Sequence, residues 1–206
     1  NAIIPVITFL GMALADMVAG SIVIEQVFNI PGLGRILLTS ISNRDYPVVQ
    51  GNQQSMHFAF LFNWAKKPWL TQKWSRSIID KYYGTGIANA YLGDEDQGQM
   101  SSWFVMAALG LFQTDGGCRI DPIYEIASPL YEKVIIDLGE RYNRGKTFTI
   151  EAKNVSRKNK YVQSAMLNGK VLNEFFFPAS ELLKGGELIL EMGDKPNTSW
   201  GIPTCN

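Results

Sequence analysis

The stretch "YLGDEDQGQMSSWFVMAALGLF", residues 91–112, decides the fold class of this chain. Its second half predicts a helix, because large and apolar residues recur there at the spacing of one buried helical face: Met100, Trp103, Phe104, Ala107 and Leu111. Its first half places Asp94, Glu95 and Asp96 in a glycine-flanked loop just before the first turn. Carboxylates at this position either cap free helix amides or perform acid–base chemistry, and the residues alone leave both interpretations open.

The residues on either side complete an α+β pattern. Residues 51–86 predict two amphipathic helices separated by a Lys-Lys-Pro-Trp turn. One helix would bury Phe58, Leu61 and Phe62, and the other Trp74, Ile78 and Tyr82. After Gly116 the pattern changes to short alternating runs, which predict antiparallel strands, with Asn168-Gly169 as a hairpin turn. These runs are "YEIA", "KVIIDL", "TFTIEA", "YVQSAML" and "ELILEM".

The first fifty residues differ in character from the rest. They carry five of the 38 charged side chains of the sequence. Residues 2–24 contain one ionisable group, Asp16, and as a helix would extend roughly 35 Å, enough to cross a bilayer. We therefore expect a membrane helix at 2–24; a buried helix or strand pair of a soluble protein is the alternative.

Composition excludes several classes of function. Nineteen basic and nineteen acidic residues balance, so nothing favours binding to nucleic acid. Cys118 and Cys205 lie too far apart for a paired-cysteine zinc site, and the sequence contains one histidine. Residue 1 is Asn, without a basic leader or a cleavage site, and we expect the chain to be cut at its front.

Residues 1–50 resemble the end of the inner-membrane permease subunit of bacterial ABC importers for dipeptides, oligopeptides or nickel. The residues that carry this resemblance are Glu25, Val27, Phe28, Pro31 to Arg35 and Arg44 to Gln50. The resemblance implies the bacterial inner membrane as location, with attachment through residues 2–24. The preceding coupling segment and a following helix of that family have no counterpart here.

Residues 51–206 resemble glycoside hydrolase family 92, calcium-dependent exo-α-mannosidases that invert the anomeric centre. The acid loop and the helix after it carry the resemblance, together with "GNQQSMHFAFLFNWAKKPWLTQKW", "YEIASPLYEKVII", "GKTFTIEAKN", "KYVQSAMLNGK" and "GGELILEMGDKPNTSWG". The family implies that residues 51–117 are the last helices of an (α/α)6 toroid and that residues 118–206 are a β-rich C-terminal segment. It also implies a mannose-containing glycan as substrate, calcium as cofactor, and the periplasm or cell surface as location.

The same resemblance implies site residues. The family's Asp-x-Asp pair supplies the catalytic base and corresponds to Asp94 and Asp96, while Glu95 between them should point elsewhere. Asn52, Gln53 and His57 match a segment at the active site and are expected sugar or metal contacts, although His57 also fits a hydrogen-bonded core residue. This segment departs from the family at two positions, because Gln53 replaces a Glu and Met56 replaces a His. Those changes remove a charge and a hydrogen-bond donor from the segment that faces the substrate.

The tryptophans and the general acid limit what the chain alone is expected to do. Trp64, Trp69, Trp74 and Trp103 lie at helical spacing, which favours the core, and at most one should contact sugar. The family's Glu-Gly-Asn-x-x-Gln segment, which carries the general acid, has no match in these 206 residues. General acid catalysis typically accelerates a reaction by about 10²–10⁴-fold. We therefore expect little or no mannosidase activity without the remainder of the glycosidase domain.

Three functions follow from the sequence. The leading one is a C-terminal mannosidase fragment joined to a permease tail, because about 150 residues resemble the hydrolase and about 50 the permease. The alternative is a permease component of a peptide or nickel importer. The third is a membrane-anchored carbohydrate-binding module. It is disfavoured because, without the rest of the toroid, each helix would leave an apolar face exposed to water.

Overall fold

The computed structural model describes residues 55–86, 95 and 97–202, all within a unit that begins at Asn52. The predicted membrane helix at 2–24 lies outside the described residues, as do Asn52, Gln53, Asp94 and Asp96. Within the described part of the chain, none of the helices combines the length and the apolar character needed to cross a membrane.

Three helices form one layer: α4 (Leu61–Trp64), α5 (Pro68–Tyr82) and α6 (Gln99–Leu109). Pro68 occupies the first turn of α5, where its missing N–H leaves no hydrogen bond unmade. The predicted turn between two helices is confirmed, but the first helix is much shorter than expected. Residues 55–60 form turns, and Lys66, at φ 58°, has the left-handed backbone that ends a helix.

Eight strands follow these helices among the described residues, and all five predicted strand runs are confirmed. The strands are β1 (Leu111–Phe112), β2 (Ile123–Ile126), β3 (Lys133–Asp137), β4 (Thr147–Lys153), β5 (Tyr161–Leu167), β6 (Lys170–Val171), β7 (Phe176–Pro178) and β8 (Gly186–Gly193). A short helix, α7 (Ala179–Leu183), precedes β8. The turn between β5 and β6 is the predicted Asn168-Gly169, at φ 50° and 77°, the positive values that a type I′ hairpin requires.

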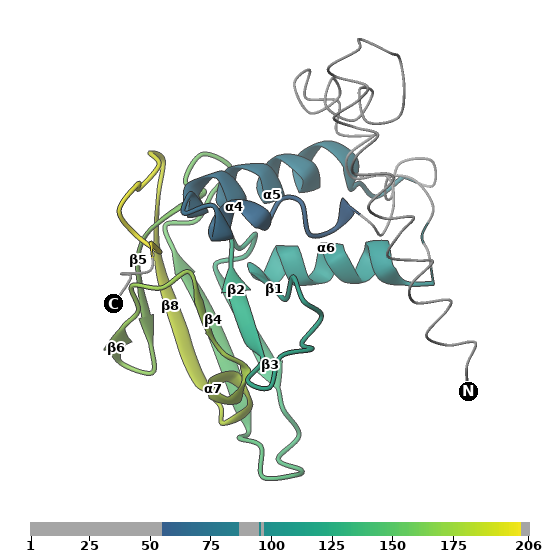
Figure 1. Ribbon diagram of the computed structural model, residues 1–206, viewed down its shortest axis with the longest axis vertical. Helices are drawn as coiled ribbons and strands as arrows, with labels where there is room; N and C mark the ends of the chain where they lie inside the picture. Colours follow the sequence, from purple (N-terminus) through teal and green to yellow (C-terminus); the bar gives the residue numbers. More distant parts are fainter. Residues whose placement is uncertain (1–54, 87–94, 96, 203–206) are drawn as a thin grey trace, which may run out of the picture. The chain divides into compact units, whose positions relative to one another are not determined.

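The expectation of purely antiparallel structure is wrong at one pair of strands. The larger sheet has the order β3-β4-β8-β5-β6, and β8 runs parallel to β4 and antiparallel to β5 (Figure 1). The chain leaves β4, builds β5, β6, β7 and α7, and then inserts β8 between β4 and β5. The alternation of apolar and polar residues along a strand shows which face of the strand is buried. It does not show whether the neighbouring strand runs parallel or antiparallel.

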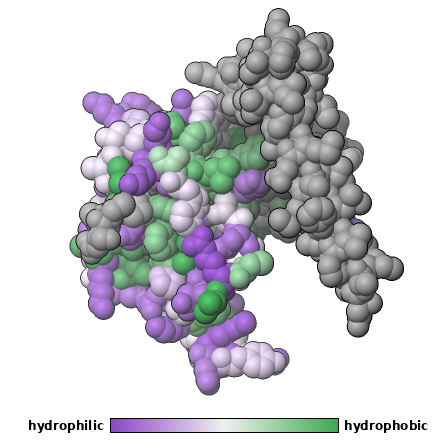
Figure 2. Space-filling model, viewed as in Figure 1, coloured by the Kyte–Doolittle hydropathy of each residue, from purple (hydrophilic) through white to green (hydrophobic). Residues whose placement is uncertain are grey.

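Two apolar cores separate three layers. The smaller sheet, β1-β2-β7, packs one face against the larger sheet, where the rings of Phe148 and Phe177 stack with centroids 6.0 Å apart. The helices cover the smaller sheet through a second core that includes Phe60, Trp103 and Ala127. Figure 2 shows hydrophilic and hydrophobic residues intermixed on the visible face of the described part.

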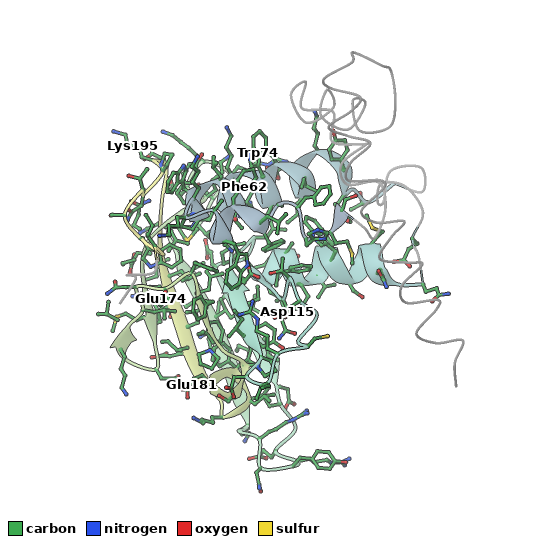
Figure 3. The ribbon with its side chains drawn as sticks, viewed as in Figure 1. Phe62, Trp74, Asp115, Glu174, Glu181 and Lys195 are labelled. Carbon is green, nitrogen blue, oxygen red and sulfur yellow. The ribbon has the colours of Figure 1, made fainter. Side chains whose placement is uncertain are left out.

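Two buried polar side chains fasten α5 to the sheets. Gln72 accepts a 3.1 Å hydrogen bond from the amide of Val162, beside an irregularity in β5, and so satisfies a backbone donor at the edge of the larger sheet. Arg76 donates to the main-chain oxygens of Pro129 and Ser156. Desolvation lowers the pKa of Arg76, and these two acceptors compensate for its burial. Trp74 lies on this same helix (Figure 3).

Candidate active site

Glu95 caps the first turn of α6. Its carboxylate accepts hydrogen bonds from the amide of Gly98, from the amide of Ser101 at 3.0 Å, and from the hydroxyl of Ser101. These bonds lower the pKa of Glu95, with the Ser101 hydroxyl as the largest cause. The capping interpretation is therefore confirmed for Glu95, and its carboxylate is committed to the helix. Asp94 and Asp96 lie outside the described residues.

The chain makes a tight turn between the acid loop and the helix. Gln97 and Gly98 have φ values of 62° and 93°, two successive left-handed residues. Gln97 adopts this conformation at a cost, because its Cβ crowds the backbone, whereas Gly98 has no such penalty. The last turn of α6 is held by two hydrogen bonds to the following chain. The oxygen of Ala108 accepts from the amide of Leu130, and the oxygen of Gly110 accepts from the amide of Ala127.

Trp103 joins the acid-loop helix to the segment that contains His57. Its indole Nε1 donates a 2.8 Å hydrogen bond to the main-chain oxygen of Met56. The ring is 1% exposed, stacks on Tyr83 with centroids 5.4 Å apart, and meets Phe60 edge-on. The prediction that Trp103 is a core residue is confirmed. Two sequence motifs more than forty residues apart therefore lie side by side.

A pocket of about 210 Å³ opens where these two motifs meet. It is lined by Met56, Gln97, Gly98, Gln99, Ser102, Trp103, Met106 and Phe112. The walls are mainly apolar, and the polar groups come from the residues that directly follow the acid loop. Met56, one of the two departures from the family pattern, contributes to this wall. An apolar pocket with a few converging polar groups is the usual form of a small-molecule site.

His57 follows Met56 in this junction. Its side chain is half-buried, and its ring meets that of Phe58 edge-on with centroids 4.8 Å apart. Its main-chain oxygen accepts hydrogen bonds from the amides of Phe60 and Leu61, which tie the turn to α4. His57 is therefore not a fully buried core residue, and it is the one predicted substrate contact that the structure describes.

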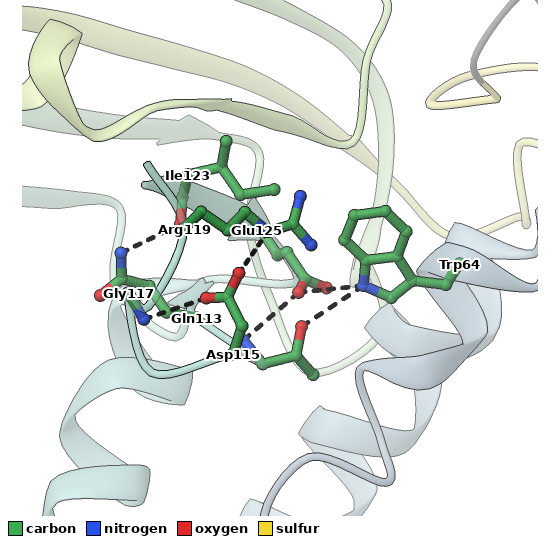
Figure 4. Close-up of polar contacts among 8 residues, drawn as sticks. Trp64, Gln113, Asp115, Gly117, Arg119, Ile123 and Glu125 are labelled. Carbon is green, nitrogen blue, oxygen red and sulfur yellow. Dashed lines mark hydrogen bonds and ion pairs between the residues drawn. The ribbon is translucent and has the colours of Figure 1, made fainter. Parts of the chain in front are cut away.

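Figure 4 shows a second polar cluster, centred on Glu125 of β2. Glu125 is 1% exposed, and its carboxylate accepts hydrogen bonds from the Asn63 amide at 3.0 Å, the Trp64 indole at 3.1 Å and the Thr114 backbone at 3.4 Å. Desolvation is the largest effect on Glu125 and raises its pKa, although the three hydrogen bonds oppose this. The sequence analysis missed Glu125. The alternation of apolar and polar residues predicted a strand here, but it did not show that this acidic side chain is buried.

An ion pair between Arg119 and Asp115 belongs to the same cluster as Glu125. Arg119 bonds to Asp115, and its guanidinium lies 4.7 Å from the centroid of the Trp64 ring. Trp64 is 43% exposed, but this cation occupies one of its faces and Phe175 meets it edge-on. The cluster therefore joins α4 to β2 and to the loop at 113–122.

The described residues do not supply a metal site. Across residues 55–86, 95 and 97–202, no three histidine, cysteine or acidic side chains are grouped so as to hold an ion.

Two solved structures of mannosidases resemble this chain in fold. An α-mannosidase of family GH92 from Bacteroides thetaiotaomicron, in complex with mannoimidazole, matches with a TM-score of 0.68 at 32% identity, over 75% of this chain and 19% of that one. An inverting mannosidase of the same family, from Bacteroides thetaiotaomicron VPI-5482, matches with a TM-score of 0.68 at 32% identity, over 85% of this chain and 23% of that one.

Curated relatives fall into two groups. An uncharacterized secreted glycosidase of Arthroderma benhamiae is 34% identical over 156 residues, 73% of this chain and 19% of that protein. The glutathione transport system permease protein GsiC of Pectobacterium atrosepticum is 56% identical over 50 residues, 24% of this chain and 16% of the permease. The similarity to the permease is thus confined to a short segment, and the chain spans about a fifth of the length of its glycosidase relatives.

The family model for the catalytic domain of glycosyl hydrolase family 92 matches residues 24–194. The match begins ahead of the boundary predicted at residue 51 and covers all of the helices and strands described above. The chain belongs to glycosyl hydrolase family 92.

Proposed function

We propose that this chain is the part of an inverting exo-α-mannosidase that carries the catalytic base. Asp94 and Asp96 are the base carboxylates, and Asn52, Gln53 and His57 contact the sugar. The observation that carries this proposal is the hydrogen bond between Trp103 and Met56, because it brings the helix after the acid loop next to the segment that contains His57.

The chemistry requires two acidic groups on opposite sides of the bond to be broken. In an inverting glycosidase the base removes a proton from water, and an acid about 6.5–9.5 Å away protonates the leaving oxygen. Asp94 and Asp96 supply the base half of this arrangement. The acid half belongs, by family resemblance, to a Glu-Gly-Asn-x-x-Gln segment that these 206 residues do not include.

Calcium and location follow the family. Calcium takes oxygen ligands and would suit vicinal hydroxyls of mannose, so it is included in the proposed function as a family expectation. Export is favoured by the secreted glycosidase among the relatives. The permease tail and its membrane attachment through residues 2–24 stay predictions, and the similarity to a permease extends over 50 residues.

Binding of mannoimidazole, the compound bound to a related mannosidase, tests this function. The purified chain should bind it in isothermal titration with calcium present, and Asp96→Asn should weaken binding at least tenfold. The gluco-configured epimer serves as the ligand control. Equal affinity for both epimers, or no effect of Asp96→Asn, would reject the proposed site.

Hydrolysis is a separate test. The chain alone should release no mannose from an aryl α-mannoside with calcium, because a base without its acid leaves the departing oxygen unprotonated. Release that is lost in Asp96→Asn would show that the chain carries a complete catalytic pair.

A further inference from the structure

We propose that the free edge of β3 is a dimerisation surface, on which two copies of this chain pair their β3 strands antiparallel about Ile135. This pairing places Lys133 of each copy opposite Asp137 of the other. In the larger sheet, with the order β3-β4-β8-β5-β6, β3 is an outer strand (Figure 1). The outer edge of such a strand presents main-chain donors and acceptors that a further strand can use.

The ladder between β3 and β4 shows which main-chain groups of β3 are free. In an antiparallel pair, alternate residues of a strand bond to the neighbouring strand. The oxygen of Glu132 accepts a 2.8 Å bond from the amide of Ala152, so the even-numbered residues of β3 bond to β4. The amides and oxygens of Lys133, Ile135 and Asp137 therefore point away from β4. Among the described residues, no second strand pairs with them.

The side chains of these same three residues lie on one face of the strand, because side chains alternate between the two faces. All three are exposed, and Ile135 is 62% exposed. One oxygen of Asp137 accepts a 2.9 Å bond from the amide of Gly139, which orients the carboxylate. Within the part of the chain that the structure describes, neither Lys133 nor Asp137 takes part in a salt bridge.

The sequence of β3, Lys-Val-Ile-Ile-Asp, carries opposite charges at equal distances from Ile135. An antiparallel pair centred on Ile135 has a two-fold axis between the two isoleucines, the symmetry of most homodimers. Both Lys133 side chains then face an Asp137 carboxylate, and opposite charges across a strand pair are stabilising. The free main-chain groups match as well, since each of the three facing pairs exchanges two hydrogen bonds.

The same charges disfavour other ways of pairing two copies. A parallel pair in register would place Lys133 opposite Lys133 and Asp137 opposite Asp137, and like charges in facing positions are destabilising. An antiparallel pair shifted by two residues would leave Lys133 without a facing carboxylate from β3. The charges at the ends of β3 therefore select one register, in addition to protecting the exposed edge from unspecific association.

Sedimentation equilibrium of the full chain measures the dimer. Three facing pairs make an interface smaller than about 1,000 Å², so the dimer is weak and reversible, with a Kd on the order of 100 μM. Lys133→Glu brings two acidic side chains together, and Asp137→Lys brings two lysines together. Each variant alone should dimerise about tenfold more weakly than the original chain.

An equimolar mixture of these two variants should recover the original affinity. In the mixed dimer, the introduced glutamate faces the introduced lysine, and the original Lys133 faces the original Asp137. Recovery also shows that both variants are folded, because a chain that fails to fold cannot present β3 to its partner.

Crosslinking locates the interface. Ile135→Cys, in a chain with Cys118→Ser and Cys205→Ser, should be joined to a second copy by a short bismaleimide. The two Cα atoms at this position would be about 5.5 Å apart in the dimer. Val171→Cys is the matched control, because Val171 is 70% exposed on β6, at the other edge of the same sheet. The control should remain uncrosslinked.

Three results would overturn the proposal: an original chain that stays monomeric at concentrations around this Kd, a mixture that associates no better than either variant, or equal crosslinking at positions 135 and 171.

Discussion

The indole nitrogen of Trp103 and the main-chain oxygen of Met56 lie 2.8 Å apart in a hydrogen bond. Trp103 belongs to the helix that follows the acid loop, and Met56 directly precedes His57. This bond satisfies a donor that would otherwise be buried alone, and it fixes the separation of the two motifs.

Trp103→Phe tests this bond. The change keeps an aromatic ring in the core but removes the N–H, and should lower the free energy of unfolding by about 1–2 kcal/mol. Amide exchange should quicken at Phe58, Phe60 and Leu61, whose amides bond within the turn around His57. Chemical denaturation and hydrogen exchange provide the two measurements.

Trp200→Phe is the matched control for this prediction. Trp200 is buried and donates a 3.0 Å hydrogen bond to the oxygen of Leu172, in the core between the sheets. The control variant should lose a similar stability but leave exchange at Phe58, Phe60 and Leu61 unchanged. Equal exchange in both variants would mean that the Trp103 bond does not order the turn.

Glu125 makes stability depend on pH. Burial raises its folded pKa, so between the ordinary value of about 4.3 and the raised value the folded chain binds more protons than the unfolded chain. The contribution of Glu125 to stability is therefore fully present below the ordinary pKa and is lost as pH rises through the folded pKa. Glu125→Gln should flatten this decline in denaturation curves recorded from pH 4 to pH 8.

The environment of Glu125 also predicts that a glutamine side chain fits well at this position. The side-chain oxygen of Asn63 is buried and has no hydrogen-bond partner among the described residues. If the Asn63 amide turns over, this oxygen can accept from the side-chain amide that the substitution introduces, while the remaining oxygen at position 125 still receives the Trp64 indole. Glu125→Gln should therefore be as stable as the original chain at pH 7, whereas Glu125→Ala should lose about 2–4 kcal/mol. A loss of that size in both would contradict this pairing.

Gly110 ends α6 at a position that accepts no side chain. Its φ is 79°, and an added Cβ would lie 2.6 Å from the Pro129 ring. Gly110→Ala should cost about 2–5 kcal/mol from left-handed strain and overpacking together.

Gly139→Ala separates the two causes, because Gly139 has a similar φ of 72° with nothing within 4 Å of an added Cβ. It should cost about 1–2 kcal/mol by thermal or chemical denaturation. If the two variants lose equal stability, the close approach of Pro129 contributes nothing.

Local patterns predicted much of the fold, and long-range pairing accounts for what they missed. The helix of residues 99–109 and the strands at 133–137 and 147–153 follow from spacing, since burial of one face imposes its period on the sequence. The parallel pairing of β8 with β4 depends on where a late strand inserts, which no local pattern records. The first helix was overpredicted and its buried face was predicted wrongly, because Phe60 is buried there while Leu61 is exposed.

The candidate site was predicted to a similar extent. Glu95 could be assigned to the helix because a carboxylate just before a first turn meets free amides. The buried Glu125 could not, since its partners Asn63 and Trp64 lie more than sixty residues away in the sequence. Asp94, Asp96, Asn52 and Gln53 stay predictions.

A map of amide shifts on adding mannoimidazole tests the central claim most directly. If the junction of Met56 with the helix after the acid loop is the sugar site, ¹H–¹⁵N signals of His57, Asp96, Gln97, Gln99 and Ser102 should move together along one binding curve. Signals near Glu125 and Gly139 should stay fixed. Saturable shifts confined to those other regions, with none at the junction, would contradict the account.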